Sequence, residues 1–257
     1  MEISSNLNSY GNNYSCKKPN FKAIPRADYK KIKCTISELE KSDVNFLERI
    51  AKNIGEFFKQ HEIEDASRKQ VVEEAVNASI EILKETKCPQ GKTKIFMAFS
   101  EDGKPSGIII GNVPKVDKNG KVHYSSRKNH GKNETELDWL AAWNKKLRSV
   151  GKALTNELYI SNLKDKTIGK MFVSSEVPWM SKAEEAYRYV GFRNLTKDAR
   201  ALKRANDNNC IIGQYDVADD LIMPMIVNKK RMTDAVNLMS KDYGRQEYIK
   251  PESIKLV

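Results

Sequence analysis

The chain has 257 residues, enough for one sizeable core with appendages, and 39% of them are hydrophobic while 31% are charged. No apolar run approaches the roughly 20 residues that span a membrane, and the polar segment Met1–Tyr14 lacks the apolar stretch of a secretory signal. The net charge of +11 is spread out, without a basic stripe interleaved with aromatic residues, so nucleic-acid binding is not favoured as the main function.

Cysteine usage points to a reducing compartment. The four cysteines are far apart and form no CxxC pair, and the three histidines do not stand beside them at ligand spacing. The residues concerned are Cys16, Cys34, Cys88, Cys210, His61, His123 and His130. We therefore expect reduced thiols, no metal site and a cytoplasmic location.

The first 32 residues have low hydrophobicity and no periodicity, which predicts a disordered tail of basic and polar character. We expect residues 1–30 to be dispensable for the fold, so that a chain starting at Ala27 unfolds at nearly the same temperature as the full chain.

From residue 33 onward, apolar spacings of three and four alternate with apolar runs typical of strands. Asp102-Gly103 supplies the positive φ of a tight turn between two strands, and Ser42 is a candidate N-cap. The predicted helices cover residues 42–58, 67–87, 149–162, 181–190 and 231–239, and the predicted strands cover 34–37, 94–99, 106–113, 135–142, 167–175 and 210–217.

This order indicates the fold class. Strands joined by short turns come first and a strand–helix–strand unit follows, which predicts an α+β fold with a central, mostly antiparallel, mixed sheet flanked by helices. We place the domain at residues 33–217. Residues 218–257 are a C-terminal extension, with a helix, that packs on the domain.

Two segments carry the functional signal. Leu137–Leu154 reads as a buried strand, a basic turn of small residues and then a helix, and a helix N-terminus after a strand has free N–H groups that attract phosphate. Ala183–Phe192 reads as a helix closed by Gly191, with an aromatic strand start after it. Together these segments resemble the acyl-coenzyme A fingerprint of the GNAT-type N-acetyltransferase superfamily.

The resemblance implies a GNAT-like sheet and transfer of an acetyl group from acetyl-CoA to an amine of a small molecule or a protein. In this superfamily the loop reads as a basic residue or Gln, two variable residues, Gly, one variable residue, then Gly or Ala. The pattern fits literally from Arg148 to Ala153, or, by helix phase, with Lys146 in the basic position and Ser149 in place of the first glycine. The implied coenzyme-binding residues are Leu140, Ala141, Lys146, Arg148, Ser149, Val150, Gly151 and Lys152.

Catalytic roles follow from the same resemblance. The tyrosine that matches the family's proton donor to the leaving thiolate is Tyr187, and the alternative is that it packs the helix on the sheet. An amine nucleophile needs a carboxylate base, for which Asp138 and Glu136 are the candidates. Alternation along the strand predicts that both carboxylates share one face, with Leu137, Trp139 and Ala141 on the other.

Two departures from the family pattern leave other functions open. Ser149 replaces a glycine, and Met180 stands where the family usually has Asn. A catalytically inactive binding or scaffold protein that keeps the fold is therefore one alternative, and a basic nucleic-acid-associated protein is another. The acceptor and the oligomeric state are not indicated by any motif.

Overall fold

The computed structural model describes residues 25–85, 91–116, 122–123, 134–144, 147, 149–164, 170–176, 187–188, 191–194 and 222–248. Its centre is a sheet with strand order β10-β1-β2-β3-β4-β6-β7-β9-β8, and β5 pairs with β4 outside this path. The strands are β1 (Pro25–Tyr29), β2 (Cys34–Glu38), β3 (Gly91–Ser100), β4 (Pro105–Val116), β5 (Val122–His123), β6 (Glu134–Ala142), β7 (Lys170–Glu176), β8 (Arg193–Asn194), β9 (Ile222–Asn228) and β10 (Arg245–Glu247).

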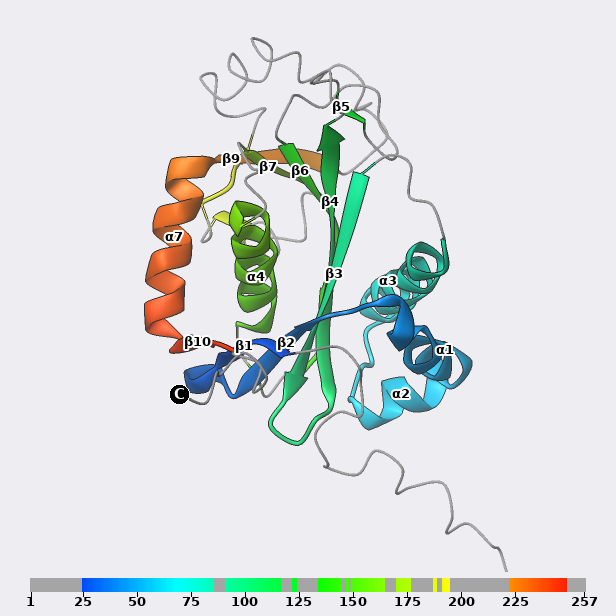
Figure 1. Cartoon of the computed structure of the whole chain (residues 1–257). Helices are drawn as coiled ribbons and strands as arrows, with labels where there is room; N and C mark the ends of the chain where they lie inside the picture. Colours follow the sequence, from blue (N-terminus) through cyan, green and yellow to red (C-terminus); the bar gives the residue numbers. More distant parts are fainter. Residues whose placement is uncertain are drawn as a thin grey trace, which may run out of the picture.

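Helices cover both faces of this sheet. The α-helices are α1 (Val44–Lys52), α2 (Ile54–Gln60), α3 (Ala66–Lys84), α4 (Val150–Lys164) and α7 (Lys229–Asp242), and the 3-10 turns are η1 (Lys30–Ile32) and η2 (Lys41–Asp43). Figure 1 shows α1, α2 and α3 on one side of β3 and β4, and α4 and α7 on the other.

Strand directions match the predicted fold class. Among the described strands, β6 and β7, which α4 connects in the chain, pair in parallel. The other pairs, such as β3 with β4 and β7 with β9, are antiparallel. The predicted α+β fold with a mostly antiparallel, mixed sheet between helices is therefore confirmed. This is the arrangement that the GNAT resemblance implies.

Each face of the sheet has its own hydrophobic core. On the α1–α3 side, Leu47, Phe57, Val72 and Trp143 pack together with the strands. On the α4 side, the core includes residues of α4, α7 and β1. In α1 the apolar residues recur at three and four positions, and this stripe packs toward the sheet. α4 is different, because it is buried on nearly all sides and buries polar as well as apolar side chains.

Several predicted elements are present with shifted ends. The hairpin turn is confirmed, with Gly103 at φ +76. The helix predicted over 42–58 is broken into α1 and α2 at Asn53, whose φ and ψ are −115 and 32. Ser42 is not the N-cap: the Asp43 carboxylate accepts from the Glu40 backbone N–H in η2, and α1 begins after it.

The predicted boundary of the N-terminal tail is wrong for residues 25–32. β1 pairs with β2 and with β10, and the side chains of Ala27 and Tyr29 are fully buried. A chain starting at Ala27 would therefore cut into a strand of the sheet. Residues 1–24 lie outside the described residues.

The predicted domain end at residue 217 is also wrong. β9 pairs with β7 along the whole length of β7, so the segment after 217 supplies a strand of the central sheet. α7 then packs beside α4, and β10 returns the chain to β1 (Figure 1). The strand predicted at 210–217 lies outside the described residues, as does most of the helix predicted at 181–190.

No helix in the described part of the chain is long and apolar enough to span a membrane.

Candidate functional site

The N-terminus of α4 has the features of an anion-binding turn. α4 begins at Val150, as the helix-phase alignment of the loop expects, and Ala153 N donates to Ser149 O at 3.0 Å. The first-turn amides of a helix have no intrahelical acceptor, and the helix dipole adds partial positive charge there. The turn contains Lys152 and no acidic residue.

Ser149, immediately before α4, has a left-handed backbone with φ +72. This conformation favours glycine, because a Cβ atom crowds the backbone there. The helix-phase alignment puts Ser149 at a family glycine, and the left-handed backbone at this position is one that glycine adopts without strain.

Close packing on the sheet fixes where α4 begins. A Cβ added to Gly107 of β4 would lie 2.9 Å from Ala141 O and 3.0 Å from side-chain atoms of Val150 and Leu154. Only glycine permits this approach of helix and strand. Gly151 is different, since an added Cβ would meet Leu140 and Ala142 at an ordinary 3.8 Å.

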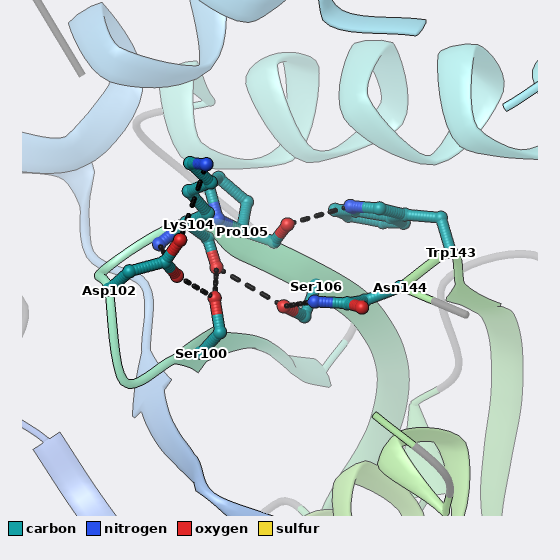
Figure 2. Close-up of polar contacts among 7 residues, drawn as sticks. All are labelled: Ser100, Asp102, Lys104, Pro105, Ser106, Trp143 and Asn144. Atoms are coloured by element: carbon teal, nitrogen blue, oxygen red, sulfur yellow. Dashed lines mark hydrogen bonds and ion pairs between the residues drawn. The ribbon is translucent and has the colours of Figure 1, made fainter. Parts of the chain in front are cut away.

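The chain that leads into the turn is anchored at the end of β6. Figure 2 shows Trp143 Nε1 donating to Pro105 O, at 2.7 Å, and Asn144 Nδ2 reaching Ser106 Oγ, at 3.2 Å. Trp143 is buried against Phe57, with ring centroids 5.6 Å apart. The end of β6 is therefore fixed to the start of β4.

The β3–β4 turn that receives this anchor is itself braced (Figure 2). Ser100 Oγ donates to Asp102 and, at 3.1 Å, to Lys104 O, and Lys104 Nζ lies 3.3 Å from Asp102 Oδ2. These contacts hold the Lys104–Ser106 carbonyls in place for the end of β6.

The parallel strands β6 and β7 separate just before this anchor. Their register runs from Glu134 opposite Lys170 to Leu137 opposite Val173, and in the described residues it goes no further. β6 continues to Ala142 beside β4, while β7 continues to Glu176 beside β9. Carboxyl ends of parallel strands that diverge are a common position for ligands.

A β-bulge lies at the point of separation, and it makes the predicted alternation along β6 wrong. Leu137 pairs with Gly111 and Trp139 pairs with Ile110, so Asp138 is the extra residue. A bulge shifts every later side chain to the other face. Accordingly Leu137 packs on the α4 side, whereas Trp139 and Ala141 pack on the α1–α3 side.

The two candidate bases differ in what the structure describes. Asp138, at the bulge, has an exposed side chain, which suits a carboxylate that takes a proton from a substrate or water. Glu136 stands before the bulge, opposite Asn112 on β4 and Phe172 on β7.

Tyr187 lies in the core on the α4 side, with its ring edge-to-face on Phe192 at 5.6 Å. Burial raises the pKa of Tyr187 above its ordinary value, so the phenol stays protonated well into the alkaline range. A donor of raised pKa is also a weaker acid, so this environment fits the packing role as well as the catalytic one.

The structure brings together part of the predicted site. Leu140, Val150 and Gly151 meet where α4 packs on β6, whereas the Ala141 side chain is on the opposite face. Lys146, Arg148 and Met180 lie outside the described residues.

Sequence reasoning missed Tyr243, whose hydroxyl donates to Ser149 Oγ at 3.1 Å. It follows α7, in a segment without a readable motif. In the part of the chain that the structure describes, no cluster of three or more His, Cys, Asp or Glu side chains could hold a metal ion.

Searches with family models and among curated proteins found no match to this chain. Among solved structures, it is similar to an uncharacterized protein from Bacillus halodurans, with 8% identity over 86% of this chain and 98% of that chain and a TM-score of 0.49. It is also similar to an acetyltransferase of the GNAT family from Staphylococcus aureus Mu50, with 16% identity, coverage of 76% and 98% and a TM-score of 0.42.

A third similar structure is a chimera of spermidine N-acetyltransferase SpeG from Vibrio cholerae and hSSAT, with 13% identity, coverage of 80% and 99% and a TM-score of 0.44. The structural neighbours thus include GNAT acetyltransferases, the family that the sequence resembles. At these identities the similarity is one of fold.

Proposed function

We propose that this chain is an N-acetyltransferase that moves an acetyl group from acetyl-CoA to an amine. The observation that carries the proposal is the separation of β6 from β7 after Leu137, on the strand whose chain continues into a glycine-type turn at Ser149 and the N-terminus of α4. A separated strand edge offers backbone groups to the pantetheine amides, and the helix start offers amides and positive charge to the pyrophosphate.

The chemistry requires a base near the amine and a donor near the sulfur. The amine nitrogen attacks the thioester carbonyl, the C–S bond breaks, and the coenzyme leaves as a thiolate that takes a proton. Asp138, exposed at the bulge, is our candidate to accept the ammonium proton. Tyr187, whose phenol is protonated at neutral pH, is our candidate donor to the thiolate.

Calorimetry with acetyl-CoA tests the binding half of the proposal. Gly151→Asp adds a negative charge to the turn, and we expect the dissociation constant to rise at least about tenfold, or about 1.4 kcal/mol. The fold should survive, because there is room for a Cβ and an acidic residue stabilises a helix N-terminus. Gly151→Ala, which adds the Cβ without the charge, is the matched control and should bind normally.

Equal affinity of wild type and Gly151→Asp, or no binding by the wild-type protein, would contradict the proposal. Steep salt dependence of binding to a polynucleotide, with no affinity for acetyl-CoA, would favour the nucleic-acid alternative.

Turnover over a panel of amines separates an enzyme from an inactive binding protein. Burial of Tyr187 is the observation that favours the inactive alternative. In an enzyme, Tyr187→Phe keeps the ring packing and should lower kcat about 10²–10⁴-fold with coenzyme affinity unchanged. Because the pKa of Tyr187 is raised, the alkaline fall of wild-type kcat due to this phenol should lie above about pH 10. Full kcat in the variant would return Tyr187 to the packing role.

A further inference from the structure

The two ends of the described chain meet beside α4. β1 and β10 pair antiparallel, with Tyr29 opposite Arg245, and both of these side chains reach Glu157 of α4. Tyr29 Oη donates to Glu157 Oε1 at 2.7 Å, and Arg245 donates to both carboxylate oxygens, with Nη2 at 3.1 Å from Oε2. Glu157 is fully buried, so the terminal strands are tied to the middle of α4.

The same C-terminal segment reaches the start of α4. Tyr243 follows α7, and its hydroxyl donates to Ser149 Oγ at 3.1 Å. Its backbone is held on both sides: Tyr243 N donates to Met239 O at 2.9 Å, and Tyr243 O accepts from Lys31 N at 3.1 Å. Gly244 follows with φ +60, a left-handed turn that glycine adopts without strain. The phenol is therefore presented from a fixed backbone.

This contact has two consequences for Ser149. It holds a non-glycine residue in the left-handed conformation that the turn requires, at a position where strain otherwise favours other backbone states. It also uses a lone pair of the Ser149 oxygen, so the serine O–H proton is left to donate to another acceptor. A phosphate oxygen bound at the first turn of α4 is such an acceptor.

We propose that Tyr243 is a positioning residue for phosphate binding, which fixes the turn before α4 and orients the Ser149 hydroxyl as a donor to the coenzyme pyrophosphate. This inference rests on the proposed function for its ligand. It gives the C-terminal segment a role that the fold alone does not need, since Arg245 and Ser240 already secure that segment to α4.

The test is a double-mutant cycle on the full chain, with coenzyme A as the calorimetric probe. Tyr243→Phe and Ser149→Gly should each weaken coenzyme A binding about 3- to 10-fold, the range for one hydrogen bond. Because Tyr243 acts through the serine hydroxyl, the double variant should bind no more weakly than Ser149→Gly. Multiplied effects, or wild-type affinity in Tyr243→Phe, would overturn the proposal.

Tyr248→Phe is the matched control, since it removes an exposed phenol from the same segment and should leave affinity unchanged. In a turnover assay the KM for acetyl-CoA should rise in Tyr243→Phe while kcat stays the same, a split that a general loss of stability would not produce.

Hydrogen exchange without ligand separates this inference from the proposed function. In Tyr243→Phe, amides of residues 149–156 should exchange faster than in the wild type and in Tyr248→Phe. Unchanged exchange would show that Tyr243 does not hold the turn. Failure of wild type to bind coenzyme A would remove the proposed function and the phosphate ligand, whereas the exchange result would still decide whether Tyr243 positions Ser149.

Discussion

The two faces of the sheet are stabilised by different interactions. The α1–α3 face is packed by aliphatic and aromatic side chains, among them Leu47, Phe57 and Trp143. The α4 face also has an apolar core, but α4 buries a series of polar side chains in it, namely Thr155, Asn156, Glu157, Ser161 and Asn162. Buried polar groups need partners, so α4 can sit only where those partners are supplied.

The partners on the α4 face come from distant parts of the chain. Asn156 Nδ2 donates to Tyr29 Oη at 2.7 Å and to Ser240 Oγ at 3.1 Å, so one side chain joins β1 and α7. Burial and the charge of Glu157 raise the pKa of Tyr29, so its hydroxyl stays a donor well into the alkaline range. The α4 face, which contains the helix N-terminus of the proposed coenzyme site, is thus assembled from both ends of the described chain. The other face is covered by the consecutive helices α1, α2 and α3.

The largest expected effect comes from removing β1. A chain that starts at Lys30 loses the buried Ala27 and Tyr29, the partner of β2 and β10, and a donor to Glu157. Loss of one buried aromatic side chain alone costs about 3–5 kcal/mol. We expect most of the cooperative urea transition, followed by circular dichroism, to disappear, since domains are stable by only about 5–15 kcal/mol.

The matched control for this truncation starts at Ile24 and keeps β1 whole. Its polar, Asn-rich missing segment predicts stability equal to that of the full chain. If the chain starting at Lys30 were as stable as the one starting at Ile24, the dependence of the α4 face on the N-terminus would be refuted.

The next effect compares single side chains from the two faces. Glu157→Ala removes the carboxylate that pairs with Arg245 and leaves the guanidinium without this partner. We expect the substitution to lower the free energy of unfolding by about 3–5 kcal/mol. Leu47→Ala on the other face should cost about 2–5 kcal/mol through a cavity. Both values come from urea titrations monitored by fluorescence.

Conservative variants sharpen this contrast. Leu47→Met should cost less than about 1.5 kcal/mol, because the apolar face requires volume and not specific partners. Glu157→Gln keeps the volume but removes the charge and one acceptor, and it should remain clearly destabilising. A harmless Glu157→Gln would mean that the α4 face also depends mainly on shape.

The same contrast explains what could be predicted from the sequence. Local signals were sufficient for the Asp102-Gly103 hairpin, for the start of α4 near Val150 and for the fold class. β1 was missed because its burial depends on β10 and α4, which are far away in the sequence. Its own residues, with Pro25, Arg26 and Asp28, look like a tail.

Other misses have similarly specific reasons. In β9 the apolar run is interrupted by Pro224, and a proline argues against a strand. The strand tolerates it because the described part of β8 pairs with Met225 and Ile226, and not with Pro224. The bulge at Asp138 reverses the faces without any sequence mark. In the sequence Glu157 looks like an exposed helix residue. Its partner Arg245 lies 88 positions later, so no local pattern indicates that the carboxylate is buried and paired.

The smallest effect is a pH dependence on the α1–α3 face. His61 ends α2, stacks on Phe57 with ring centroids 4.1 Å apart, and has Nδ1 2.9 Å from Phe57 O. Burial lowers the pKa of His61, and Lys104 lowers it further, although Asp102 and the carbonyls of Phe57 and Pro105 act in the opposite direction.

The sign of this effect follows from proton linkage. Below about pH 6.5 the unfolded chain protonates its histidine while the folded chain resists, so the free energy of unfolding falls as the pH drops from 6.5 toward the lower folded pKa. Above pH 6.5 both states are neutral and His61 adds no slope. His61→Gln should therefore be less stable at every pH because the stacking is lost, but its urea midpoint should fall less between pH 7 and 5.5 than that of wild type. Parallel curves for the two proteins would show that His61 has the same pKa in the folded and the unfolded chain. The stability of the α1–α3 face would then not depend on a buried titratable side chain.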